Sequence, residues 1–151
     1  MQAARGENRI ELLGRVIDRP VLSHQNHGTD YYIMPLAVPR LSGTEDVLNL
    51  VLSGALCKRP VVRRTPLGRS ICDLLLAVNR AYGRADYLPC IAWGTLAQRC
   101  GSLEVGDGVR LEGRLQSRIY QKVVEGVTQE RTAFEVSVMR LEPVEQAAAS
   151  S

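Results

Sequence analysis

Short segments in which hydrophobic and polar residues alternate run along most of the chain, separated by Gly, Pro, Asn and Asp. Such alternation is typical of β-strands with one buried face, and frequent turn residues between them are typical of a barrel or a sandwich. One segment differs, because Thr95 could cap a short helix that continues to Cys100. The pattern therefore predicts this helix and strands at residues 9–17, 31–39, 47–56, 70–79, 87–93, 109–122 and 132–141.

A pattern of forty residues occurs twice, because residues 14–54 and 54–94 are identical at thirteen of 41 positions without a gap. Ordinary residue usage predicts roughly two or three identities. A repeat of this size indicates one supersecondary unit used twice. The second copy has three aromatic residues where the first has none: Tyr82, Tyr87 and Trp93 stand opposite Ser42, Val47 and Ser53.

The order of elements from residue 47 onward predicts an OB-fold, a five-stranded Greek-key barrel. Three strands are followed by the short helix and two more strands, so the helix joins strands three and four. Only the second copy is followed by these elements, so only it can close a barrel. We therefore expect an all-β protein with a truncated OB-like repeat at residues 1–46, a complete OB-fold at 47–144 and a disordered tail at 145–151. A generic β-sandwich is the alternative.

Basic charge is concentrated in the middle of the chain, although the total is only +3. Residues 1–53 hold five Arg/Lys against six Asp/Glu, residues 54–122 hold twelve against five, and residues 123–151 hold two against five. The net charges are therefore −1, +7 and −3. A local basic surface favours a polyanionic partner. A charged face that is merely solvated is the alternative.

The predicted strand at residues 109–122 has one apolar face and one cationic face. Val109, Leu111, Leu115 and Ile119 share the first, with Gly113 and Ser117 between them, which predicts a core-facing set. The second carries an aromatic ring among cations: Arg110, Arg114, Arg118, Tyr120 and Lys122. Cations that follow phosphates, beside a ring on which a base can stack, are what sequence-tolerant binding of single strands requires.

Further aromatic and basic residues extend this candidate surface. Tyr87 and Trp93 lie six residues apart and therefore on one face of their strand, although a single Trp could equally belong to the core. Tyr82 lies in a predicted loop between Arg80 and Arg84, where an exposed ring has little structural reason to be. A basic hairpin with its turn at residues 65–68 adds three candidate phosphate contacts: Arg63, Arg64 and Arg69. The alternative is that this hairpin is only a solvated tip.

No enzymatic site is recognisable in the sequence. It has no glycine-rich phosphate loop, no nucleophile elbow and no cysteine pair with zinc spacing. His24 and His27 have no neighbouring cysteine, so we expect neither a metal nor another cofactor. The four cysteines predict buried reduced thiols, and no secretory signal or membrane-spanning segment is expected. We therefore expect a cytoplasmic, nucleoid-associated protein without catalytic activity.

Three segments together resemble the bacterial single-stranded DNA-binding protein family. They are Asp86-Tyr87-Leu88-Pro89-Cys90-Ile91-Ala92-Trp93-Gly94-Thr95-Leu96-Ala97, Gly106 through Tyr120, and Leu75-Leu76-Ala77-Val78-Asn79-Arg80. The stretch from Cys57 to Arg69 is similar to a clostridial-type variant in which two such domains occur in tandem. The resemblance covers residues 49–144 well and 7–53 more weakly. It implies an OB barrel that forms oligomers and stacks single-stranded DNA on rings, here Tyr82, Tyr87, Trp93 and Tyr120.

The resemblance implies roles in replication, recombination or repair, with single-stranded DNA as the partner and homo-oligomers as the assembly. The chain ends Gln-Ala-Ala-Ala-Ser-Ser instead of in the family's acidic tip, so recruitment of partner enzymes is not expected. Tyr at three stacking positions, in place of larger rings, predicts somewhat lower affinity. An assembly protein that acts through protein contacts is the alternative function, because the first copy keeps the strands without the rings.

Overall fold

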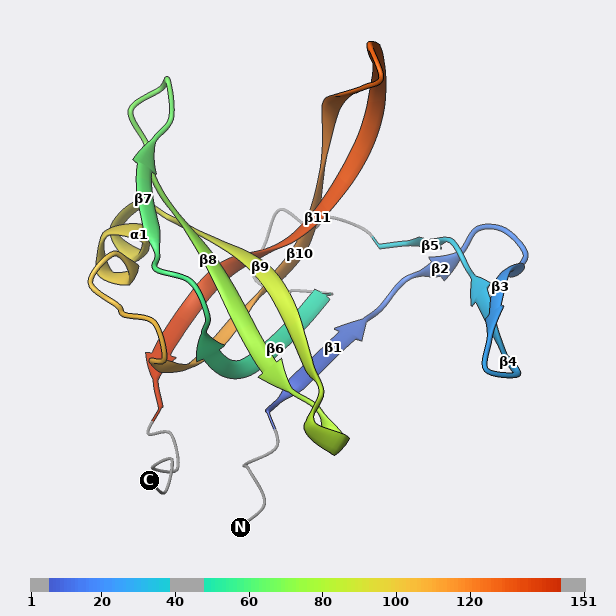
Figure 1. Ribbon diagram of the computed structural model, residues 1–151, viewed down its shortest axis with the longest axis horizontal. Coiled ribbons are helices and arrows are strands. Elements are labelled where there is room, and N and C mark those ends of the chain that lie inside the picture. The colour runs from blue at the N-terminus through green and yellow to red at the C-terminus, as the bar shows by residue number, and fades with distance from the viewer. Residues whose placement is uncertain (1–5, 39–47, 145–151) are drawn as a thin grey trace. The chain divides into compact units, whose positions relative to one another are not determined.

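The computed structural model describes residues 6–38 and 48–144, which fall into two compact units (Figure 1). The barrel unit contains the described residues up to Arg9 and from Leu50 onward, and the N-terminal unit spans Ile10–Asn49. The predicted tail at 145–151, the boundary between residues 46 and 47, and Ser42 and Val47 lie outside the described residues.

The barrel unit is an OB-fold, as predicted. Its sheet has the order β1-β6-β10-β11-β9-β8-β7, and an additional pairing of β6 with β8 closes the barrel. The parallel pairing of β9 with β11 joins its two halves, and the helix α1 follows β9 directly. The elements are β6 (Leu48–Leu56), β7 (Val61–Arg64), β8 (Ser70–Asn79), β9 (Ala85–Trp93), α1 (Gly94–Cys100), β10 (Gly108–Val124) and β11 (Val127–Pro143).

The barrel core consists of alternate residues of these strands, which is why the alternating pattern predicts them. Leu52 and Leu56 of β6 meet Leu76 of β8 and Leu111 of β10, all almost completely buried. Each such leucine contributes about 1.5–3 kcal/mol relative to exposure. Ala97 and Cys100 of α1 pack on the same core. The helix therefore covers part of the barrel interior.

Two local predictions are wrong. The helix begins at Gly94, not at Thr95, and no side chain caps it. Leu115 and Ile119 are exposed instead of buried, because β10 pairs with β6 only as far as Gly113 and then continues with β11 as a long hairpin (Figure 1). The hairpin ends in a two-residue turn, Glu125-Gly126, in which both residues have positive φ, as tight hairpins of this kind require.

The N-terminal unit reproduces the strand register of the second copy at an offset of 40, except that β3 has a bulge at Ser23 that shifts its pairing with β4 by one residue. Arg15 pairs with Ala37 and Val16 with Leu36, as Ala55 pairs with Ala77 and Leu56 with Leu76. Gly28 and Gly68 both have the positive φ of a turn. The repeat in the sequence is therefore a repeat in the structure. Its strands are β1 (Asn8–Leu12), which begins in the barrel unit, β2 (Arg15–Val16), β3 (Val21–Asn26), β4 (Thr29–Ile33) and β5 (Leu36–Ala37).

The described residues contain no helix long and apolar enough to cross a membrane. No group of three or more His, Cys, Asp or Glu among residues 6–38 and 48–144 could hold a metal ion. His24 is instead stacked on Tyr31, with ring centroids 4.7 Å apart, and His27 lies in the turn after β3.

The core thiols make the stability of the barrel sensitive to alkaline pH. Burial raises the pKa of Cys72 to about 11 and that of Cys90 to about 12. A thiol in the unfolded chain ionises near about 8.5, so the neutral thiols stabilise the fold below that pH and the contribution is lost as pH rises towards 12. We expect the free energy of unfolding, measured with urea, to fall by roughly 2 kcal/mol per thiol between pH 8 and 10.5. Cys90→Ala should show a smaller fall, and an equal fall would contradict this assignment.

Candidate nucleic-acid interface

Tyr82 is the most exposed aromatic residue described. It occupies the tip of the β8–β9 hairpin, in the short 3-10 turn Ala81–Gly83, and its side chain is 100% exposed. Its φ is +65°, a left-handed conformation that costs a non-glycine residue roughly 1–2 kcal/mol. The backbone hydrogen bond from Arg80 N–H to Arg84 C=O closes the loop beneath it. A strained residue with an uncovered ring is more typical of a binding site than of a structural loop.

Tyr87 and Trp93 lie along one face of β9, about 20 Å apart at about 3.3 Å per residue. Tyr87 is 63% exposed, whereas Trp93 is half-buried. The Arg69 guanidinium carbon lies 5.3 Å from the centroid of the Trp93 ring, so a cation rests on the indole. Leu88 and Ala92 point to the other side of β9 and pack in the barrel core. Trp93 is thus not a core residue.

Pairing across the sheet places the other candidates on this same face, which we call the outer face. Directly paired residues of neighbouring strands point to the same side of a sheet. Arg63, Ile71 and Trp93 form one such row. The next row crosses five strands: Arg114, Ser137, Ile91, Asp73 and Val61.

The β10–β11 hairpin extends the outer face past the barrel. Arg118, Tyr120 and Lys122 follow Arg114 on alternate positions of β10. Tyr120 is 37% exposed and pairs with Arg131 of β11, a cation that falls just outside the predicted strand at residues 132–141. If the predicted strand at 132–141 were extended by one residue, its alternation would have placed Arg131 among the candidates.

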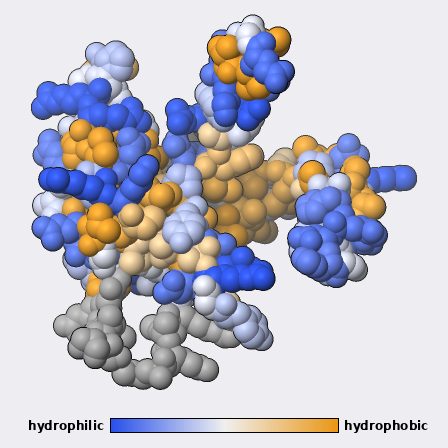
Figure 2. Space-filling model, viewed as in Figure 1, coloured by the Kyte–Doolittle hydropathy of each residue, from blue (hydrophilic) through white to orange (hydrophobic). Residues whose placement is uncertain are grey.

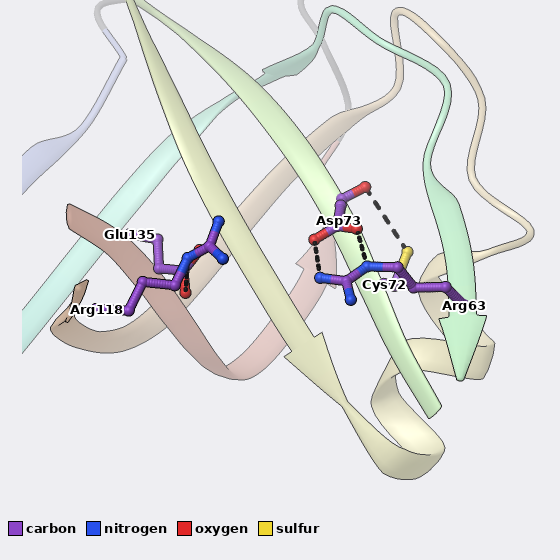
Figure 3. A network of polar contacts seen from close by, with 5 residues as sticks. All are labelled: Arg63, Cys72, Asp73, Arg118 and Glu135. Carbon is purple, nitrogen blue, oxygen red and sulfur yellow. Dashed lines mark hydrogen bonds and ion pairs between the residues drawn. The ribbon is translucent and has the colours of Figure 1, made fainter. Parts of the chain in front are cut away.

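Carboxylates pair with several of the predicted phosphate-binding cations (Figure 3). Arg63 Nε lies 2.6 Å from Asp73 Oδ2, and Arg118 Nε lies 3.6 Å from Glu135 Oε1. Glu135 also accepts a hydrogen bond from Gln116 and is mostly buried. These two carboxylates were not identified from the sequence, since their partners become neighbours only through the strand register.

Two further cations are paired at other places. Arg110 contacts Glu7 and Glu112, at 3.3 and 3.2 Å, at the end of β10 where β6 lies alongside. Arg80 contacts Asp86 at 3.3 Å beside the Tyr82 turn. The hydrogen bond with Asp73 raises the pKa of Arg63, and the one with Glu112 raises the pKa of Arg110. These guanidiniums therefore stay charged at any ordinary pH.

The remaining cations are available to a ligand. Five of the predicted cations make no ion pair with any residue in 6–38 or 48–144: Arg64, Arg69, Arg84, Arg114 and Lys122, of which Arg69 lies over the Trp93 ring. Arg114 and Lys122 lie on the outer face, and Arg84 lies beside Tyr82. Arg64 is the last residue of β7 and has the opposite parity to Arg63, so it does not share the outer face. The structure thus brings together Tyr87, Trp93 and Tyr120 with most of the cations, while Tyr82, Arg110 and Arg64 lie at the margins.

The comparison with known proteins agrees with this geometry. A sequence model of the single-strand binding protein family matches residues 47–144. We found no significant match among individual curated proteins. The match covers well over half of the chain and includes every strand of the closed barrel. The chain therefore belongs to the single-strand binding protein family.

Proposed function

We propose that single-stranded DNA lies across the outer face of the barrel and stacks its bases on Tyr82, Tyr87, Trp93 and Tyr120. Members of this family are non-enzymatic proteins that bind single-stranded DNA. The observation that carries the proposal is the placement of three rings, two exposed and one half-buried, on one face of the sheet among cations. Every base has a flat face, so stacking of this kind is tolerant of sequence.

The cations of the proposed site divide into two groups, which we propose contribute differently. Arg84, Arg114 and Lys122 are without a carboxylate partner in the described residues and can contact phosphates directly. Arg63 and Arg118 already hold Asp73 and Glu135, so a phosphate must replace the carboxylate or share the cation with it. The Arg63–Asp73 pair is exposed on both sides, and exposed pairs are worth about 0–1 kcal/mol, so exchange at Arg63 costs little.

The affinity for oligo-dT should fall steeply with added salt. Neutralised phosphates release counterions, and the slope of log K against log[salt] is about −0.7 per phosphate for single strands. If Arg84, Arg114 and Lys122 each neutralise one phosphate, the slope is about −2, and binding weakens about twentyfold between 50 and 200 mM salt. Fluorescence anisotropy of a labelled oligonucleotide measures this.

Arg114→Ala with Lys122→Ala should make that slope less steep by about 1.4. Arg99→Ala serves as the matched control, because Arg99 is an exposed cation of the helix α1 and is not part of the sheet. A salt-independent affinity, or a double variant with the unchanged slope, would contradict the electrostatic part of the mechanism.

We also propose that the protein acts as a homo-oligomer in replication, recombination or repair, in keeping with its family. The proposed division is a truncated OB-like repeat at 1–46 and the binding domain at 47–144. The shared register of the two copies supports it, as does the use of β6 by the barrel, where it pairs with both β8 and β10. A strand with both edges occupied cannot serve a second barrel.

A further inference from the structure

The N-terminal unit has an apolar face equivalent to the one that forms the core of the barrel, but this face is not buried. Seven residues of the barrel core cluster have apolar counterparts forty positions earlier within residues 10–38, and none of these counterparts is buried. Tyr32 and Met34, for example, are 60% and 51% exposed, where Cys72 and Leu74 are 0% and 4% exposed. We call this set the open face: Ile10, Leu12, Val16, Tyr32, Met34, Leu36 and Val38. Hydrophobic side chains are visible at the surface of the β2–β5 segment in Figure 2.

In the barrel, the equivalent face is covered by the second half of the OB-fold. That half consists of β9, α1, β10 and β11, whose residues Cys90, Ala97 and Val136 belong to the core cluster. The described residues contain this half once, and it is already closed against β6 and β8. Nothing equivalent is left for the open face, and its area of apolar side chains is of the kind that marks an interaction site.

The charge around the open face limits what can cover it. Residues 10–38 hold Arg15 and Arg19 against Glu11, Asp18 and Asp30, a net charge of −1. An apolar, nearly neutral face is unsuited to DNA. It is suited to a second copy of itself, because a two-fold axis brings each patch onto the same patch, and mixed charges at the rim can then meet opposite charges.

We infer that the open face of one chain packs on the open face of a second chain, so that two half-repeats supply each other's missing layer. The contact is isologous and separate from the outer face that carries the DNA-binding residues. Each half-repeat thereby gains the cover that β9–β11 give to the second copy. This surface goes beyond the proposed DNA-binding function and does not depend on it.

The test uses the full chain with the photocrosslinker p-benzoylphenylalanine in place of Tyr32. Mixed 14N- and 15N-labelled chains are irradiated and the products mapped by mass spectrometry, so that links between chains are separated from links within one. We expect links between chains that join position 32 to residues 10–38 of the partner. Links that join position 32 only to residues of its own chain, links to residues 50–143, or no links would overturn the inference.

Two aspartate variants give a matched comparison in the same assay. Met34→Asp places a charge in the open face and should lower the yield of links between chains at least tenfold. Ile33 is the last residue of β4, has the opposite parity to Tyr32 and Met34 and is exposed like Met34, and Ile33→Asp introduces the residue that the second copy has at Asp73. It should leave the yield within twofold of the unmodified chain. Equal effects of the two substitutions would overturn the assignment of the face.

Discussion

Replacement of both Trp93 and Tyr120 by alanine is expected to weaken the binding of oligo-dT by roughly 2–6 kcal/mol, at about 1–3 kcal/mol per stacked base. Trp93 lies on the outer face under Arg69, and Tyr120 lies on the hairpin between Arg118 and Lys122. Neither belongs to the core cluster, so their loss should leave the barrel folded. Fluorescence anisotropy at one fixed salt concentration measures the loss.

The control for this double variant is Leu67→Ala. Leu67 is 90% exposed at the tip of the β7–β8 hairpin and offers no ring on which a base can stack. The intensity of Trp93 emission provides a second reading in the unmodified chain, because a stacked base quenches it. A folded double variant that binds as tightly as the unmodified chain would remove both rings from the proposed site.

The rings could be predicted from the sequence because parity alone assigns faces within one strand. Tyr87 and Trp93 are an even number of residues apart, as are Arg118, Tyr120 and Lys122, and each set lies on one face in the structure. Parity cannot say whether anything covers the face. Leu115 and Ile119 alternate as a core strand should, yet they lie beyond Gly113, where the pairing of β10 with β6 ends.

The carboxylates of the outer face could not be predicted for a related reason. Arg63 and Asp73 are ten residues apart on two strands, and only the pairing of Val61 with Asp73 makes them neighbours. Arg118 meets Glu135 because Gln116 pairs with Glu135 across the hairpin. A shift of the register by one residue would turn each carboxylate to the other face. The number of cations free for phosphate therefore follows from register and not from composition.

The repeat also explains why a glycine recurs at one position of the two copies. Gly14 and Gly54 occupy equivalent positions, and a Cβ added to either would collide with a backbone carbonyl oxygen, that of Ala37 or of Ala77 respectively. In the barrel this close approach is where β6 crosses from β10 to β8, pairing Ala55 with Ala77. Gly recurs at an offset of 40 because two strands come together there.

Gly54→Ala should accordingly destabilise the barrel by about 3 kcal/mol, at the upper end of the usual cost of overpacking. The added methyl group meets the backbone of Ala77 rather than a flexible side chain, so β6 must move away from β8 at the pairing that closes the barrel. For a domain of this size the midpoint of thermal unfolding should fall by roughly 10 °C or more. Circular dichroism during heating measures it.

Two substitutions separate this steric effect from a general sensitivity of the strand. Ser53→Ala changes the neighbouring residue of β6 and leaves its backbone hydrogen bond to the Glu7 carbonyl in place, so the midpoint should stay within a few degrees. Gly14→Ala makes the equivalent collision in the N-terminal unit, which is compact by itself, and should spare the main transition. An unchanged midpoint for Gly54→Ala would mean that β6 and β8 do not approach as closely as their register requires, and the barrel would then have to close by a different pairing.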